Sequence, residues 1–60
     1  MKQEIAKRLK AYRKLKGLSQ KQLAELAGLS VTTVNHIEQG CDATLSTMDK
    51  IEEALGASLL

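Results

Sequence analysis

The sequence has no proline, phenylalanine or tryptophan, and it has one tyrosine and one cysteine. A single cysteine cannot close a disulfide within one chain, which excludes a disulfide-stapled secreted scaffold and indicates a reducing compartment. Aromatic residues are almost absent and leucine far outnumbers valine, whereas a β-sheet favours β-branched and aromatic side chains. The missing proline fits uninterrupted helices. We therefore expect an all-α fold with an aliphatic core.

Further absences limit the functions that are open to the chain. No apolar run approaches the roughly 18 residues of a membrane span, and no secretory signal pattern is present. His36 is the only histidine, and it has no partners at a spacing typical of metal ligands. Nothing arranges serine, histidine and aspartate as a catalytic triad. We predict a cytoplasmic protein without cofactor, metal or enzymatic activity, and we regard Cys41 as a bystander.

Acidic residues are scarce in the first third of the chain. Residues 1–21 contain eight lysines and arginines against Glu4, whereas residues 22–60 contain Lys50 against six acidic residues. The formal net charge of +2 hides this asymmetry. The basic segment is either a solvated helix face or a surface that attracts a polyanion at long range.

Sixty residues make a single domain, residues 1–60. The spacing of apolar residues predicts helices at about 2–16, 20–27, 31–38 and 45–55 and the possible start of a fifth at 58–60. Ser19, Ser30 and Thr44 are the expected N-caps of the last three helices, and Gln22 completes a capping box with Ser19. The side chains expected to face inward are Ile5, Leu9, Tyr12 and Leu15 in the first helix, Leu23, Leu26 and Ala27 in the second, Thr33, Val34 and Ile37 in the third, and Leu45, Met48, Ile51, Ala54 and Leu55 in the fourth.

The most informative segment is 20–39, in which two short amphipathic helices are joined by Ala27-Gly28-Leu29-Ser30. Gly28 can take a positive φ just past a helix end, and the small Ala24 lets the two helices cross closely. This is the sequence form of a helix-turn-helix, which holds one helix outward with a width suited to the major groove of DNA.

One face of the third helix carries short polar side chains instead of the usual lysines and glutamates. At 100° per residue, the outward positions are Val31, Thr32, Asn35, His36 and Gln39. Such side chains either contact base edges through hydrogen bonds and methyl contacts, or simply solvate an exposed helix. His36 is accordingly a DNA-facing donor or a plain surface residue.

Four motifs carry a resemblance to a known family: Arg13-Lys14-x-x-Gly17-Leu18-Ser19-Gln20, Leu23-Ala24-x-x-Ala27-Gly28-Leu29-Ser30, Val34-x-x-Ile37-Glu38-x-Gly40 and Leu55-Gly56. With these motifs the chain resembles the Cro and C1 repressor type of helix-turn-helix domain, also called the xenobiotic-response-element family. The resemblance runs over nearly the whole chain. It implies a compact bundle of four to five helices in which helices 2 and 3 form the helix-turn-helix.

The resemblance also implies a function: a nucleoid-associated transcriptional regulator, expected to be a repressor, that binds a palindromic double-stranded operator as a homodimer. By the resemblance, helix 3 lies in the major groove, residues matching Val31, Thr32 and His36 touch bases, and residues matching Ser19 and Gln20 meet phosphate. The complete set of candidate DNA contacts is Val31, Thr32, Asn35 and His36 for bases and Ser19, Gln20, Lys21 and Thr44 for phosphate. Arg13 and Glu38 are expected to form a structural ion pair.

One departure from the family keeps a second function open. After helix 3, relatives often have a basic, proline-containing loop, whereas this chain has Cys41-Asp42-Ala43, and Asp42 would repel phosphate. The fourth helix is also acidic. The alternative is an antitoxin subunit or a co-activator-type interaction module that uses the same helical fold on a protein partner.

Overall fold

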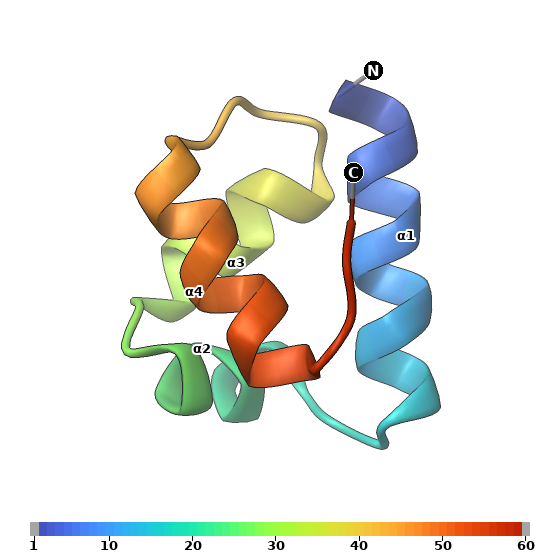
Figure 1. Cartoon of the computed structure of the whole chain (residues 1–60), viewed down its shortest axis with the longest axis vertical. Helices are drawn as coiled ribbons and strands as arrows, with labels where there is room; N and C mark the ends of the chain where they lie inside the picture. The colour runs from blue at the N-terminus through green and yellow to red at the C-terminus, as the bar shows by residue number, and fades with distance from the viewer. Residues whose placement is uncertain (1, 60) are drawn as a thin grey trace.

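A computed structural model, described for residues 2–59, contains four helices and no strand within that range. They are α1 (Lys2–Leu15), α2 (Gln20–Ala27), α3 (Val31–Glu38) and α4 (Leu45–Leu55). In Figure 1, α2, α3 and α4 gather on one side of the molecule, and α1 stands along the other side. The all-α architecture predicted from the sequence is confirmed. The first helix ends one residue earlier than expected, because a turn begins at Lys16.

The helices begin where side-chain oxygens cap their free N–H groups. Ser19 Oγ accepts from the Gln22 backbone N–H at 3.0 Å, and Gln22 Oε1 accepts from the Ser19 N–H at 2.8 Å, which completes the expected capping box. Ser30 caps α3 and Thr44 caps α4 through equivalent bonds of 3.1 Å. The predicted caps are therefore confirmed, and they fix the register of α2, α3 and α4.

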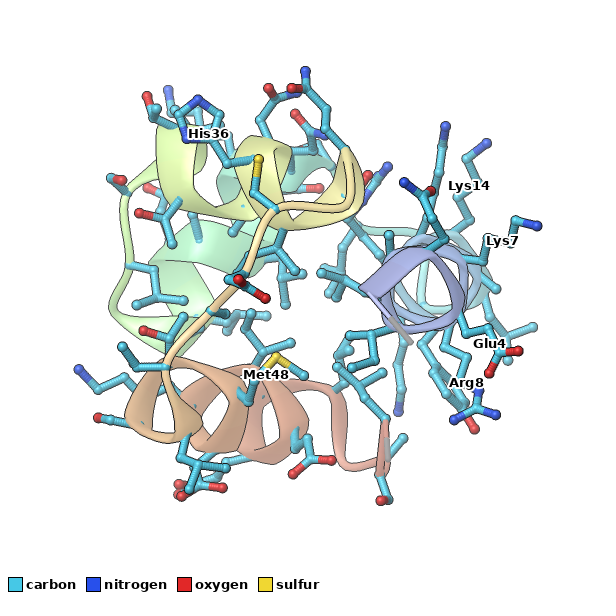
Figure 2. The ribbon with its side chains drawn as sticks, turned by 90° about the horizontal axis from the view of Figure 1, so that it is seen from above. Glu4, Lys7, Arg8, Lys14, His36 and Met48 are labelled. Carbon is cyan, nitrogen blue, oxygen red and sulfur yellow. The ribbon has the colours of Figure 1, made fainter. Side chains whose placement is uncertain are left out.

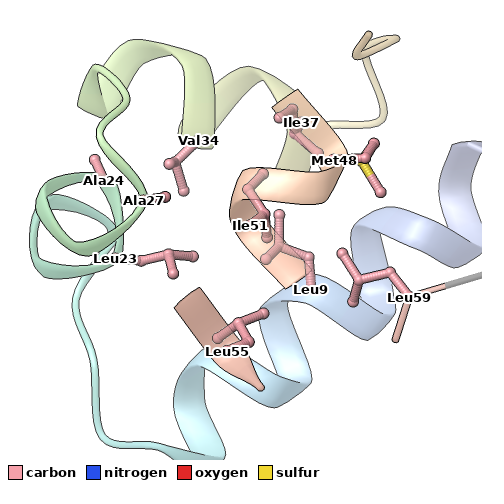
Figure 3. Close-up of a cluster of buried hydrophobic side chains, with 10 residues drawn as sticks. All are labelled: Leu9, Leu23, Ala24, Ala27, Val34, Ile37, Met48, Ile51, Leu55 and Leu59. Carbon is pink, nitrogen blue, oxygen red and sulfur yellow. The ribbon is translucent and has the colours of Figure 1, made fainter. Parts of the chain in front are cut away.

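Within residues 2–59, an aliphatic core joins α1, α2, α3 and α4 to the C-terminal segment (Figure 3). Its members are Leu9, Leu23, Ala24, Ala27, Val34, Ile37, Met48, Ile51, Leu55 and Leu59. Ile5, Tyr12 and Ala54 are partly buried against it. α2 contributes Leu23 and the small Ala24 and Ala27 to this core, and α3 contributes Val34 and Ile37, so both helices of the corner pack directly on the rest of the bundle.

Three leucines that the sequence pattern placed inward are exposed: Leu15 at 82%, Leu26 at 62% and Leu45 at 75%. Leu15 and Leu45 are the last residue of α1 and the first of α4, where no neighbouring helix covers them. In α2 the buried stripe runs through Leu23, Ala24 and Ala27, which turns Leu26 to the outer edge. The helical period locates the apolar face of a helix, but it does not decide whether a residue at the border of that face is buried.

The segment after α4 is not a helix at residues 58–59, which corrects the expected start of a fifth helix; Leu60 lies outside the described residues. Leu59 is 0% exposed in the core. Its backbone N–H donates to Glu52 Oε2 at 2.6 Å, and its carbonyl accepts from Arg8 Nη1 at 3.0 Å. Side chains of α1 and α4 thus supply hydrogen-bond partners for the backbone of Leu59. The segment runs extended beside α1 (Figure 1).

None of the helices described in residues 2–59 combines the length and the apolarity that crossing a membrane would require.

Candidate nucleic-acid interface

The corner between α2 and α3 has the backbone geometry of a helix-turn-helix. Gly28 has φ 71° and ψ 32°, the left-handed conformation that the sequence pattern predicted for it. The next residue, Leu29, donates its N–H to the Ala24 carbonyl at 2.9 Å, which closes the end of α2. Ala24 is 2% exposed and lies in the same buried cluster as Val34, and its small side chain allows α2 and α3 to cross closely.

The outer face of α3 is free of the rest of the protein at four of the five positions expected there. Val31 is 46% exposed, and Thr32, His36 and Gln39 are also exposed, whereas Asn35 is half-buried. In Figure 2 the His36 ring projects away from the body of the molecule, whereas Met48 points between the helices. The opposite face of α3 buries Val34 and Ile37, with Thr33 half-buried.

A chain of side-chain hydrogen bonds, here called the amide relay, links α2 to this outer face. It consists of Glu38, Gln20, Asn35 and Gln39. Gln20 Nε2 donates to Glu38 Oε1 at 3.1 Å. Asn35 Nδ2 donates to Gln20 Oε1 at 3.3 Å, and Gln39 Nε2 donates to Asn35 Oδ1 at 2.9 Å. A candidate phosphate contact, Gln20, and a candidate base contact, Asn35, are thus bonded to each other.

The inner end of the amide relay is an ion pair between α1 and α3. Arg13 Nε donates to Glu38 Oε2 at 2.6 Å and Arg13 Nη2 to Glu38 Oε1 at 3.1 Å, with side-chain exposures of 11% and 4%. Arg13 Nη1 also donates to the Leu18 carbonyl at 2.8 Å. The predicted pair is therefore present, and it fixes α1 against α3. The Arg13 guanidinium is therefore engaged in contacts within the protein rather than with phosphate.

Charge and hydrogen bonding shift the pKa values of this pair. The hydrogen bond to Glu38 and its negative charge raise the pKa of Arg13, against the opposing effect of burial. Burial works against ionisation of Glu38, but hydrogen bonds from Arg13 and Gln20 and the charges of Arg13 and Lys10 lower its pKa below the usual 4.5. Glu38 is consequently a carboxylate at neutral pH.

The other candidate phosphate contacts lie at helix N-termini. Ser19, Lys21 and Thr44 are exposed at the starts of α2 and α4. The hydroxyl oxygens of Ser19 and Thr44 are engaged as caps, and Thr44 also donates to Thr47 Oγ1 at 3.0 Å. What these two positions offer an anion is chiefly the positive end of the helix dipole, whereas Lys21 offers a full charge.

A shallow hollow brings together one candidate base contact, His36 of α3, and one candidate phosphate contact, Thr44 at the start of α4. It is lined by residues of α3, of the loop that follows and of the start of α4, among them Thr33, His36, Asp42, Thr44 and Thr47. Cys41 also lines it and is exposed. Among the residues that the structure describes, no three histidine, cysteine or carboxylate side chains are grouped as metal ligands.

The basic side chains of α1 divide into two groups. Lys7 and Lys14 are exposed and project outward from α1 (Figure 2). Arg8 holds the C-terminal segment and lies 3.9 Å from Glu4, so it acts within the fold like Arg13. The positive charge that α1 presents apart from these contacts therefore comes from lysines rather than arginines.

Sequence reasoning missed the amide relay and the burial of Leu59. The bond between Gln20 and Asn35 joins residues 15 positions apart on different helices, which no helical period reports. The only available signal was the concentration of amide side chains on the helix-turn-helix, at Gln20, Gln22, Asn35 and Gln39.

Comparison with known proteins gives concordant results. The helix-turn-helix family HTH_3 matches residues 9–60. A putative HTH-type transcriptional regulatory protein of Archaeoglobus fulgidus is 43% identical over 51 residues, which are 85% of this chain and 16% of that protein. Control protein C.SmaI of Serratia marcescens is 37% identical over 60 residues, 98% of this chain and 71% of that protein.

The fold has a counterpart among solved structures. The crystal structure of an HTH_3 family transcriptional regulator from Vibrio cholerae superposes with a TM-score of 0.89 at 41% identity, covering 97% of this chain and 33% of that one. This chain thus spans a minor part of the Archaeoglobus and Vibrio proteins and most of the Serratia protein. Since the family match covers the second half of α1 and all of α2, α3 and α4, and the Serratia protein aligns over almost the full length, the chain belongs to the helix-turn-helix family HTH_3.

Proposed function

We propose that this chain binds double-stranded DNA as part of a transcription regulator and reads base edges in the major groove with α3. The observation that carries the proposal is the division of α3 into two faces. Val34 and Ile37 are buried, whereas Val31, Thr32 and His36 are exposed without a protein surface over them. The names of the related proteins, which include transcriptional regulators and a control protein, support the same function.

Specificity is assigned to Val31, Thr32 and His36, with Asn35 as a fourth candidate. A valine or threonine methyl packs on the C5-methyl of thymine, and threonine and histidine form hydrogen bonds with base edges. Asn35 differs from the other three because both ends of its carboxamide have partners within the protein. Its role as a base reader stays a prediction.

Affinity is assigned to phosphate neutralisation around α3. Lys21 lies in the first turn of α2, and Thr44, just before α4, lines the hollow that His36 also lines. Cationic groups and helix N-termini bind backbone phosphate and set the register of a protein on the duplex without reading sequence. Asp42, which lines the same hollow, weakens non-specific binding by repulsion.

Repression, two-fold dimerisation and a palindromic operator complete the proposal. Dimers of helix-turn-helix domains bind half-sites about 34 Å apart, so a single copy of this small surface binds weakly by itself. The proposal includes no cofactor and no catalytic step.

The proposal is tested by selecting bound sites from random duplex DNA at two salt concentrations. Enrichment of one site, with affinity that falls steeply as salt rises, is the expected result because phosphate contacts release counterions. A palindromic site would support the dimer. No enrichment of any sequence, together with salt-insensitive capture of a protein partner, would overturn DNA binding in favour of an antitoxin or co-activator-type module.

A further inference from the structure

The direction of the amide relay is fixed at its inner end by charge. An ionised carboxylate only accepts hydrogen bonds, and Arg13 binds both oxygens of Glu38. Gln20 must therefore turn its nitrogen to Glu38, which leaves its oxygen to accept from Asn35. Reversing the Gln20 amide would place its oxygen against the carboxylate. The buried ion pair thus sets which atoms the next side chains present.

The same constraint passes from Gln20 to Asn35 and on to Gln39. Asn35 gives one hydrogen of Nδ2 to Gln20, and its Oδ1 accepts from Gln39. A primary amide has two hydrogens and two oxygen lone pairs. After these two bonds, Asn35 retains one hydrogen and one lone pair. Since its side chain is half-buried on the outer part of α3, these are the groups left for DNA.

This remaining pattern matches one purine and not the other. In the major groove adenine presents the acceptor N7 beside the donor N6, whereas guanine presents two acceptors, N7 and O6. An unrestrained asparagine can turn both hydrogens towards guanine. Asn35 within the relay cannot do so, because one of its hydrogens is held by Gln20.

We propose that Gln20 is a positioning residue for base recognition, which acts through Asn35 so that α3 favours adenine over guanine at the base pair that Asn35 faces. The inference rests on the proposed function, because it requires α3 in the major groove. It differs from a phosphate contact by Gln20, which would affect every DNA sequence alike. Gln20 can fill both roles, because its Nε2 retains a second hydrogen that can be donated to phosphate.

The test compares Gln20→Met with a matched control, Gln22→Met. Methionine keeps the length of glutamine without its amide, and Gln20→Met leaves the Arg13–Glu38 pair in place. Gln22 is exposed on the same helix and bonds to the Ser19 backbone, outside the relay. The base pair that faces Asn35 is identified as the position of the site at which Asn35→Ala loses the base preference of the wild type. Affinities are then measured for duplexes with adenine or guanine at that position.

Wild type and Gln22→Met are expected to bind the adenine duplex about tenfold more tightly than the guanine duplex, which is the size of one good bidentate contact. In Gln20→Met this ratio falls to about one. A Gln20→Met protein that loses affinity for both duplexes equally, with the ratio intact, would overturn the proposal and leave Gln20 a phosphate contact. A wild type that prefers guanine would also overturn it. So would an Asn35→Ala protein that keeps the wild-type base preference at every position of the site.

A second measurement compares modified duplexes on the wild-type protein, so the folding of Gln20→Met does not enter. At the same position, 7-deazaadenine removes the N7 acceptor and unsubstituted purine removes the N6 amino group. Because Asn35 is left with one hydrogen and one lone pair, each analogue is expected to weaken binding about fivefold or more. Full affinity for either analogue would contradict the inference.

The two failures are distinguishable. If wild type selects no DNA sequence, the proposed function fails and the inference fails with it. If wild type selects a site, but Gln20→Met keeps the preference for adenine over guanine and the analogues bind wild type with full affinity, only the inference fails.

Discussion

Arg13 and Glu38, 25 positions apart in the sequence, form a doubly hydrogen-bonded ion pair that fixes α1 to the helix proposed to contact DNA. The pair lies beneath the outer face of α3 and is largely shielded from water. A single carboxylate therefore receives the guanidinium of one helix and, through Gln20, the start of another. The orientation of α3 depends on three helices meeting at this one group.

Removing one partner of this pair is expected to destabilise the protein strongly. Arg13→Met leaves the Glu38 charge buried without its cation, which costs about 3–5 kcal/mol in the free energy of unfolding. The double variant Arg13→Met with Glu38→Met loses less, because no charge is stranded. Unfolding in urea measures both. Lys14→Met, on an exposed neighbour, is the control at about 0.5 kcal/mol or less; an Arg13 variant as stable as this control would refute the role of the pair.

The pair also predicts how stability depends on pH. The pKa of Glu38 is lowered on folding, so its contribution is present above the usual value of 4.5 and is lost as pH falls through the lower folded pKa. Wild type is expected to exceed Glu38→Gln in stability near neutral pH, with the difference shrinking in acid. Urea unfolding at a series of pH values measures it. If the difference in the free energy of unfolding stayed constant as the pH fell well below 4.5, the role given to the Glu38 carboxylate would be contradicted.

The C-terminal segment is expected to be part of the stable fold. Leu59→Ala removes a side chain that is 0% exposed and should cost about 2–5 kcal/mol in the free energy of unfolding. Leu26→Ala makes the same chemical change at a side chain that is 62% exposed, and it should cost about 0.5 kcal/mol or less. Equal, small losses for the two variants would mean that residues 57–59 do not complete the core.

His36 and Lys21 are expected to separate base recognition from phosphate binding. His36→Ala should relax the preference at one base position by about 1–3 kcal/mol. Lys21→Ala should weaken all sequences alike and lower the slope of log affinity against log salt by about one. Titration of the selected and a scrambled duplex measures both variants. Equal losses on the two duplexes for His36→Ala would remove His36 from the base-reading set.

Local signals in the sequence were sufficient for the elements of the fold. The caps Ser19, Ser30 and Thr44 and the glycine at 28 each act within a few residues, and each is observed as expected. The faces of the helices were harder to assign. Leu26 looked buried by spacing alone, but Ala24 occupies the side that meets α3, because close helix crossing favours the smaller residue.

The site was predictable in part. The outer face of α3 and the Arg13–Glu38 pair followed from spacing and from the family resemblance. The bond from Gln20 to Asn35 depends on how far α2 and α3 approach each other, a tertiary quantity that a one-dimensional pattern does not contain. The DNA contacts of Val31, Thr32, Asn35, His36, Ser19, Gln20, Lys21 and Thr44 stay predictions.

The central claim is that the exposed face of α3 is the surface that meets DNA, and an amide NMR titration with the selected duplex tests it most directly. The account predicts the largest shifts at Val31, Thr32 and His36 and at the start of α2, with Asp49 and Glu53 of the acidic α4 unaffected. Shifts that gather on α4 while Val31, Thr32 and His36 stay unchanged would contradict it.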